Sequence, residues 1–335
     1  MQTPRDNVLR AIRHEPPEQL PATLYLEEGL KRRLEECGYR RDEQFVNDTV
    51  RILWNVEHRI VDESTFFDPF GVRWQRSSGA YFFEDPPLVE PDAGRIPRIK
   101  LLPDNEVQRI VSIRQAHPDR FIFYQFTMTF GERLWALRGM EEYLMDLAVH
   151  PTFVHEALDR LLEMHMEALD VLVTLPLDGI TFGDDFGSQK GLMISPGAFR
   201  TFYKPRLAAM YRRVREAGMV VGAHSCGDNT AIMGDYVDIG LEVFHPLQPE
   251  CMDIAAIKRD FGRHLAFRGG IGTQGAAAHG TPEEARSAVF NTARILSDGG
   301  GYLLEPCKPL PSEAPLETAL AFIEAMQEAR SYRFP

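Results

Sequence analysis

The sequence lacks the features of several protein classes. It has no run of about 18 apolar residues, which is the length that a membrane-spanning helix requires, so no such helix is expected. Its first 21 residues contain no apolar core of the kind found in signal peptides, which favours a cytoplasmic protein. There are only four cysteines among 335 residues, and disulfides are not expected in a cytosolic chain of this size.

Positive charge is also scarce. Lysine and arginine number 37 against 49 acidic residues, and the formal net charge is −12. A protein that grips nucleic acid through phosphate contacts, or that docks on anionic lipid, needs an excess of positive charge. We therefore expect neither a nucleic-acid partner nor a membrane partner.

Short apolar runs recur along the chain and alternate with segments of helical periodicity, especially after residue 120. Such alternation is typical of parallel βαβ units, whose strands are buried on both faces. The runs are Ala22–Leu26, Phe121–Phe126, Gly179–Phe182, Val220–Ala223, Val243–Phe244, Leu265–Arg268 and Tyr302–Leu304, with an eighth near Ile60–Phe67. About eight units, without a GxGxxG motif after an early strand, favour an α/β fold of the (β/α)8 TIM-barrel type.

Helix start signals support this organisation. Thr3-Pro4, Ser195-Pro196 and Thr281-Pro282 each place an N-cap hydroxyl before a first-turn proline. Residues 66–100 are interpreted as an insertion that forms a β-hairpin beside the barrel mouth. We predict one barrel domain over residues 1–335, with an N-terminal extension and this hairpin-like insertion.

Polar and sulfur-containing residues follow the predicted strands, where a barrel places its active site. His224 and Cys226 are two residues apart, so an extended strand puts both side chains on one face. Cys307 ends the last strand, and Glu250 follows the strand after His224. Imidazole, thiolate and carboxylate groups are zinc ligands, although an H-x-C pair alone also fits a buried cysteine beside a hydrogen-bonded histidine.

Two further groups of residues are candidates. Asp184 and Asp185 directly follow a strand and are predicted to position substrate or handle protons, unless one of them caps a loop. Gly269, Gly270 and Gly272 follow another strand, where they could cradle a phosphate or leave room for a bulky cofactor. We favour the second interpretation.

Several segments resemble one known family. They are GDDFGSQKGLMISPGAFRTFYKP (183–205), GMVVGAHSCGD (218–228), EVFHPLQPE (242–250), LAFRGGIGTQ (265–274), GGYLLEPC (300–307) and the opening TPRDNVLRAIRHEPPEQLP. Together they resemble the methyltransferase branch of the uroporphyrinogen decarboxylase superfamily, which includes enzymes of the methylcobalamin:coenzyme M type. The resemblance spans nearly the whole chain, and its most specific part is H-x-C with a distant cysteine.

The resemblance implies a TIM-type barrel and a Zn²⁺ ion held by His224, Cys226 and Cys307, with Glu250 at the position of a further ligand. It implies transfer of a methyl group between a corrinoid, either free cobalamin or a corrinoid protein, and a thiol or tetrahydrofolate acceptor. The sequence does not identify the methyl donor or the acceptor.

Two other functions remain alternatives. One is a cofactor-free decarboxylase that acts on a tetrapyrrole, and the other is a barrel that binds a tetrapyrrole without chemistry. The decarboxylase is disfavoured because Glu27 and Glu28 stand where the family's arginine-rich segment would hold substrate carboxylates.

Overall fold

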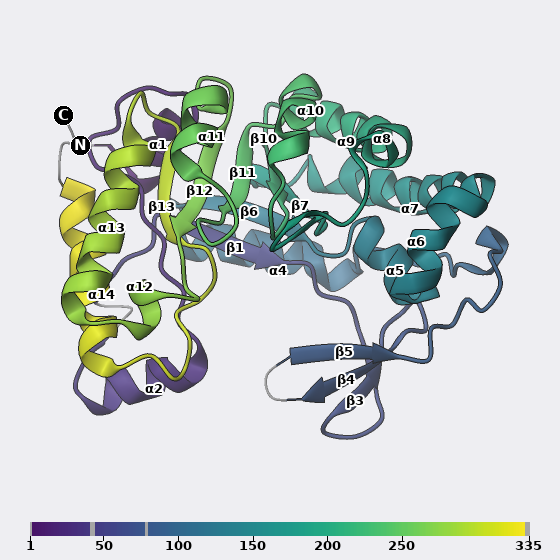
Figure 1. Cartoon of the computed structure of the whole chain (residues 1–335), viewed down its shortest axis with the longest axis horizontal. Helices are drawn as coiled ribbons and strands as arrows, with labels where there is room; N and C mark the ends of the chain where they lie inside the picture. Colours follow the sequence, from purple (N-terminus) through teal and green to yellow (C-terminus); the bar gives the residue numbers. More distant parts are fainter. Residues whose placement is uncertain (1, 41–43, 78–79, 332–335) are drawn as a thin grey trace.

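The computed structural model of the chain describes residues 2–40, 44–77 and 80–331. Its centre is a curled sheet of seven parallel strands (Figure 1). In their order across the sheet, the strands are β1 (Thr49–Leu53), β6 (Phe121–Phe126), β7 (Gly179–Gly183), β10 (Val220–His224), β11 (Val243–Leu247), β12 (Ala266–Ile271) and β13 (Tyr302–Pro306). Helices lie between consecutive strands of this sheet, and the fold is an α/β barrel of the TIM type.

The gap between the two edge strands of the sheet is spanned by the predicted strand Ala22–Leu26. Ala22 forms an isolated parallel bridge to Leu304 within β13, and Leu26 forms one to Leu310 just after β13. On the other side, the Asp48 amide donates to the Ala22 carbonyl at 3.0 Å, next to the start of β1. This segment therefore bridges β13 and β1 without forming a regular ladder.

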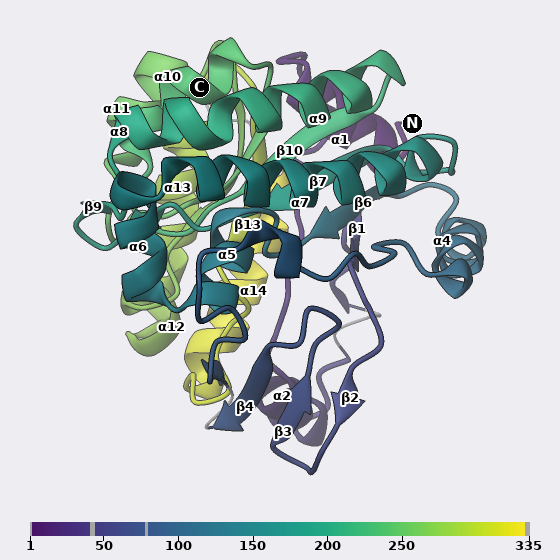
Figure 2. The ribbon, with the colours of Figure 1, turned by 90° about the vertical axis from the view of Figure 1, so that its right-hand side faces the viewer.

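The prediction of a barrel strand near Ile60–Phe67 is wrong. These residues belong to β2 (Arg59–Ile60) and β3 (Thr65–Phe67), which lie in a separate antiparallel sheet with β4 (Arg73–Ser77) and β5 (Ala80–Glu84). The missing barrel strand is β1, which we did not predict because Arg51 interrupts its apolar residues. The predicted hairpin is present as the antiparallel pair β4–β5, and its sheet stands apart from the barrel (Figures 1 and 2).

Helices cover the outside of the barrel, and α7 and α9 run side by side across it (Figure 2). The longer helices are α1 (Pro4–Ile12), α2 (Glu28–Glu36), α4 (Asp104–Ala116), α5 (Gly131–Arg138), α6 (Met140–Val149), α7 (Pro151–Leu172), α9 (Lys204–Glu216), α11 (Ile254–Phe261), α13 (Pro282–Ser297) and α14 (Leu316–Ser331). Shorter elements are η1 (Ala93–Arg95), α8 (Pro196–Ala198), η2 (Phe199–Tyr203), η3 (Thr230–Ile232), α10 (Met233–Asp238), α12 (Ala276–His279) and the small β8–β9 pair (Gly187–Ser188 and Gly191–Leu192). The three predicted N-caps, Thr3, Ser195 and Thr281, all accept hydrogen bonds from the first turns of their helices.

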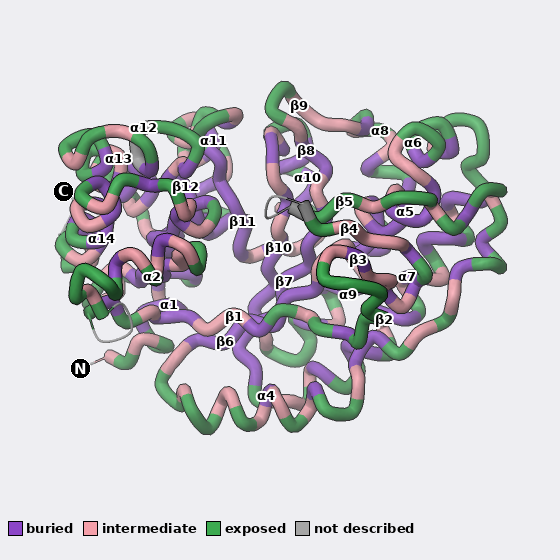
Figure 3. The backbone as a smooth tube through the Cα atoms, turned by 90° about the horizontal axis from the view of Figure 1, so that it is seen from below, coloured by how far each residue is buried: buried purple, intermediate pink, exposed green. Residues whose placement is uncertain are grey.

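The barrel interior is apolar at its amino end and polar at its carboxyl end. Val8 and Ile12 of α1 close the amino end and pack on a cluster of inward side chains that includes Phe121 and Phe123. The tube is coloured as buried along most of β6, β7 and β11 (Figure 3). Because the amino end of the barrel is packed with apolar side chains, the carboxyl edge is the place where polar side chains converge. Within the described residues, no helix is long and apolar enough to cross a bilayer.

The capping box of α13 gives a first testable prediction. The Thr281 hydroxyl accepts from the Glu284 amide at 3.2 Å, and the Glu284 carboxylate accepts from the Thr281 amide at 2.8 Å. Thr281→Ala should lower the free energy of unfolding by about 1 kcal/mol, because it leaves a first-turn amide without its acceptor. Urea unfolding measures this, and Thr281→Ser, which keeps the hydroxyl, should lose less than half as much. Equal losses in the two variants would contradict the capping role.

Candidate active site

The candidate site lies at the carboxyl ends of β7 and β10. His224 is the last residue of β10, and it is in register with Gly183 of β7 on one side and His245 of β11 on the other. The loops that leave these strands carry Asp185 and Cys226. The parallel register thus brings side chains that are some forty residues apart in the chain to one edge of the barrel.

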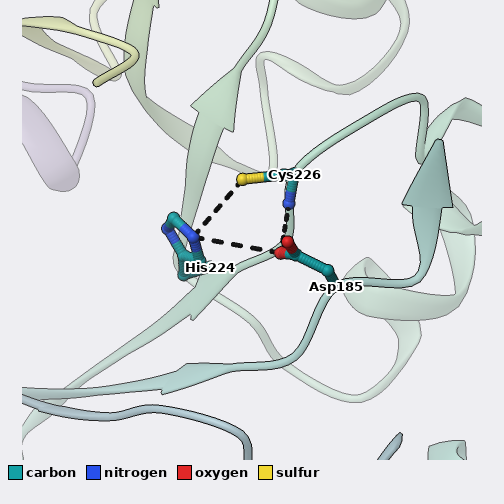
Figure 4. A group of neighbouring side chains, drawn as sticks. All are labelled: Asp185, His224 and Cys226. Carbon is teal, nitrogen blue, oxygen red and sulfur yellow. Dashed lines mark hydrogen bonds and ion pairs between the residues drawn. The ribbon is translucent and has the colours of Figure 1, made fainter. Parts of the chain in front are cut away.

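Asp185, His224 and Cys226 form a compact group of potential metal ligands (Figure 4). One ligand atom from each lies within 4.8 Å of the others. The His224 Nε2 atom is 3.6 Å from the Cys226 sulfur and 3.9 Å from an Asp185 carboxylate oxygen. The same Asp185 oxygen accepts the Cys226 amide at 2.7 Å, so the carboxylate also holds the backbone of the cysteine in place.

The loop after β10 is tied down from within. The Asn229 side-chain amide donates to the carbonyls of Ser225, Cys226 and Gly227, at 3.0 to 3.2 Å. Gly227 has a φ of +80°, and a Cβ there would lie 2.3 Å from the backbone of Gly187, so only glycine fits. These contacts fix the backbone of the loop that carries Cys226.

Burial controls the protonation of this group. Burial, with the negative charge of Asp185 as the next cause, raises the pKa of Cys226 to about 12. Burial lowers the pKa of His224 to about 4, and Asp185 acts in the opposite direction. A neutral imidazole beside a protonated thiol is therefore the stable state near neutral pH, unless a cation favours the thiolate.

Cys307 and Glu250 are neighbours of this group but not members of it. Cys307 is buried, and its thiol lies 3.3 Å from the Leu247 carbonyl of β11. Burial raises the pKa of the Cys307 thiol, and the nearby carboxylates of Glu250 and Glu305 raise it further. The Glu250 carboxylate is exposed and accepts the Gln274 amide at 3.1 Å.

A chain of buried polar side chains lies behind His224. The Nδ1 atoms of His224 and His245 are 2.7 Å apart, so one of these nitrogens carries the shared proton. The His245 Nε2 atom, which is buried and has no hydrogen-bond partner in the described part of the chain, is 3.8 Å from Glu305. Glu305 is paired in turn with Arg268 at 3.1 Å. When His224 donates from Nδ1, its Nε2 lone pair faces Cys226 and Asp185.

Asp184 is not a member of the compact group. Its carboxylate accepts the amides of Phe130, Gly131 and Glu132, at 2.7 to 2.9 Å, and so holds the start of α5. Burial raises the pKa of Asp184 to about 7 despite these donors. Glu132 lies in the same region, where burial and the charges of Asp185 and Asp184 raise its pKa. The two aspartates therefore occupy different positions, one at a helix start and one at the group.

The three candidate glycines lie close to protein atoms. A Cβ at Gly269 would lie 3.2 Å from Pro246, and one at Gly270 would lie 2.5 Å from Leu296 of α13. A Cβ at Gly272 would meet the Glu250 carboxylate at 2.4 Å. The positive φ values of Gly269 and Gly270, +100° and +85°, add a backbone reason for glycine. A cofactor-binding role for these positions stays a prediction.

Sequence reasoning missed two features of the site. It identified Asp185 as a catalytic candidate but did not place it beside His224 and Cys226. The spacing of these residues in the sequence does not show how the loop after β7 folds. It also gave no role to Glu132, which arrives from a helix start some fifty residues earlier. The H-x-C spacing, in contrast, correctly brought His224 and Cys226 together.

Comparison with known proteins identifies the family. The family model of uroporphyrinogen decarboxylase (URO-D) matches residues 135–329, which is more than half of the chain. The chain therefore belongs to the URO-D family. No curated protein matches the sequence.

One solved structure shares the architecture over almost the whole chain. A methyltransferase from Methanosarcina mazei superposes with a TM-score of 0.71 at 18% sequence identity, over 98% of this chain and 99% of that chain. At this identity the likeness shows a shared fold. A 3-keto-L-gulonate-6-phosphate decarboxylase from Vibrio cholerae is far less similar, with a TM-score of 0.30 and 12% identity over 67% of this chain and 79% of that chain.

Proposed function

We propose that the chain is a zinc-dependent methyltransferase that moves a methyl group between a corrinoid and a small acceptor, either a thiol or tetrahydrofolate. The observation that carries the proposal is the pairing of His224 Nε2 with the Cys226 sulfur beside the Asp185 carboxylate. Membership of the URO-D family, and a fold shared with a methyltransferase, support this class of chemistry.

The donor atoms fit a zinc ion. Tetrahedral zinc, with sulfur at about 2.3 Å and nitrogen at about 2.0–2.1 Å, separates these two ligands by roughly 3.6 Å. The His224–Cys226 separation is 3.6 Å. We assign His224, Cys226 and Cys307 as ligands, and Glu250 and Asp185 are the candidates for the fourth position, which exchanges with substrate. Bound zinc would lower the pKa of a coordinated thiol, so that it reacts as a thiolate near neutral pH.

The chain's own residues perform the remaining tasks. Asp185 and Asn229 hold the Cys226 loop, and His245 orients the His224 ring. Asp184 fixes the start of α5 beside the site. These contacts keep the ligand geometry in place before substrate binds, which is the main contribution of protein groups around a catalytic metal.

The direct test is an assay of methyl transfer from methylcobalamin, with 2-mercaptoethanesulfonate and tetrahydrofolate as separate acceptors. The absorbance of methylcobalamin, which falls as the methyl group is removed, measures the rate. We expect turnover with one of them, loss of turnover after zinc is removed, and recovery when zinc is restored. Turnover of uroporphyrinogen by zinc-free protein would instead favour the decarboxylase alternative. A corrinoid protein as the donor partner would give higher turnover than free methylcobalamin.

His245 provides a test of how the site is oriented. His245→Phe removes the partner of His224 Nδ1 and should weaken zinc binding by about 10–100-fold, because outer-shell partners fix ring orientation. Competition with a chromophoric chelator measures the affinity. His245→Asn can place an amide group near the position of Nδ1 and should recover part of the loss. If the two variants bound zinc equally well, the positioning role of His245 would be wrong.

A further inference from the structure

A cavity of about 650 Å³ lies between the carboxyl edge of the barrel and the small antiparallel sheet. The barrel side contributes Trp54, just after β1, and Thr127 and Met128, just after β6. The other side is formed by residues of β2 to β5 and the loops that join them. Pockets of about 300–1,000 Å³ are of the size that binds small molecules.

The sheet side of the cavity presents a set of aromatic rings centred on Phe66. The Phe66 ring stacks on His58 at 4.6 Å and on Trp74 at 6.4 Å between ring centroids. Tyr81 meets it edge-on at 5.9 Å. All four side chains line the cavity, and Tyr81 is 56% exposed. Rings in this arrangement favour a flat π-system, which can continue the stack.

One residue of the cavity wall, Arg133, carries a buried hydrogen-bond donor. Arg133 is 3% exposed, and its Nη1 atom is paired with Asp68, which also accepts the Trp74 indole N–H at 3.1 Å. The Arg133 Nε atom has no hydrogen-bond partner within the described ranges. An unsatisfied buried donor is costly, so a ligand that offers an acceptor atom here gains stabilisation.

The charges around the cavity argue against a strongly ionic ligand. Asp62, Glu63 and Arg76 line it together, and Asp68 is already paired with Arg133. Burial lowers the pKa of His58, so its ring adds no positive charge near neutral pH. The lining thus carries no excess of positive charge for a phosphate or a carboxylate.

We propose that this cavity binds an uncharged, planar aromatic or heteroaromatic molecule, which stacks in the Phe66–Trp74–Tyr81 set and accepts a hydrogen bond from Arg133 Nε. The cavity lies at the same edge of the barrel as the candidate site but two strands away: Thr127 follows β6, and a Cβ on Gly183 of β7, which is in register with His224 of β10, would lie 3.5 Å from the Thr127 Cα. The identification of this molecule as the methyl donor or acceptor rests on the proposed function. The proposal that the cavity binds it does not depend on that function.

The test uses the full chain without zinc and three probes of similar size. Acetophenone has a ring and an acceptor, α-methylstyrene has the same shape without the acceptor oxygen, and cyclohexyl methyl ketone keeps the acceptor on a saturated ring. Saturation-transfer NMR titrations give the affinities. We expect acetophenone to bind at least about 5-fold more tightly than either of the other probes, as expected for one stacking contact or one hydrogen bond.

Two neighbouring residues of β5 provide matched variants. Tyr81 and Phe82 are 56% and 55% exposed and point to opposite faces of the sheet, but only Tyr81 lines the cavity among the described residues. Tyr81→Ser should weaken acetophenone binding by about 2–10-fold, and Phe82→Ser should leave it unchanged.

Three results would overturn the binding proposal: no acetophenone binding up to its solubility, equal affinity for the saturated ketone, or equal effects of the two variants. Because the titrations need no metal, the two proposals fail separately. A protein that binds acetophenone in the expected pattern but transfers no methyl group keeps the cavity assignment and loses the proposed function.

Discussion

Cys226→Ser and Cys307→Ala should each reduce zinc from one ion per chain to a small residual fraction and abolish methyl transfer. A direct ligand contributes more than an outer-shell partner, whose loss costs about 10–100-fold, so activity should fall by more than that range. Serine retains the size of Cys226 but not its affinity for zinc, because the thiolate is the ligand that zinc prefers. Elemental analysis of the purified variants measures the zinc content.

Cys251→Ser is the matched control. Cys251 is half-buried, its thiol lies 3.6 Å from the Gln248 carbonyl, and it is not part of the compact group. This variant should keep both zinc and activity. Wild-type zinc content in Cys226→Ser would remove Cys226 from the ligand set, and a loss of zinc in Cys251→Ser would mean that the effect is not specific to the proposed ligands.

Asp146→Ala should be strongly destabilising, although Asp146 lies outside the candidate site. The Asp146 carboxylate is 1% exposed and binds Arg138, which is 2% exposed, through Nε at 2.7 Å and Nη2 at 3.3 Å. Arg138 also donates from Nη1 to the carbonyls of Leu88 and Val89, so it cannot turn out to solvent without breaking these bonds. Removing the carboxylate takes away the buried partner of a buried charge and leaves only the exposed Glu142, so we expect a loss of about 3–5 kcal/mol.

Glu142→Gln tests the same arginine from its exposed side. Glu142 lies 3.4 Å from Arg138 Nη2 but is 57% exposed. Its loss should cost no more than about 1 kcal/mol, because solvent screens exposed pairs. Urea unfolding compares the two variants, and similar losses would show that burial does not determine the strength of these ion pairs.

The barrel was predictable where its strands are continuous apolar runs. β6, β7, β10, β11, β12 and β13 were all anticipated, because strands buried on both faces cannot tolerate many polar residues. β1 was missed because Arg51 interrupts its apolar run. In the structure the Arg51 guanidinium lies 4.4 Å from the Tyr25 ring. The segment at 60–67 was misassigned because aromatic and β-branched residues suit an antiparallel hairpin as well as a barrel strand.

The candidate site was predictable only in part. The spacing of His224 and Cys226 predicted that their side chains meet, and the structure brings them together, although β10 ends at His224 and Cys226 lies in the loop after it. The proximity of Asp185 depends on how the loop after β7 folds back, and the contact with His245 depends on the register between β10 and β11. Neither is encoded in local spacing. The approach of Cys307 and Glu250 to the metal stays a proposal drawn from family resemblance.

The most direct test is a crystal structure of the zinc-loaded protein, with diffraction data measured on both sides of the zinc absorption edge. The account predicts one anomalous peak within about 2.0–2.3 Å of His224 Nε2 and of the sulfur atoms of Cys226 and Cys307. A peak elsewhere, or no peak in protein purified without chelators, would contradict it. The His224–Cys226 pair would then be a histidine beside a buried thiol, within a barrel of the URO-D family.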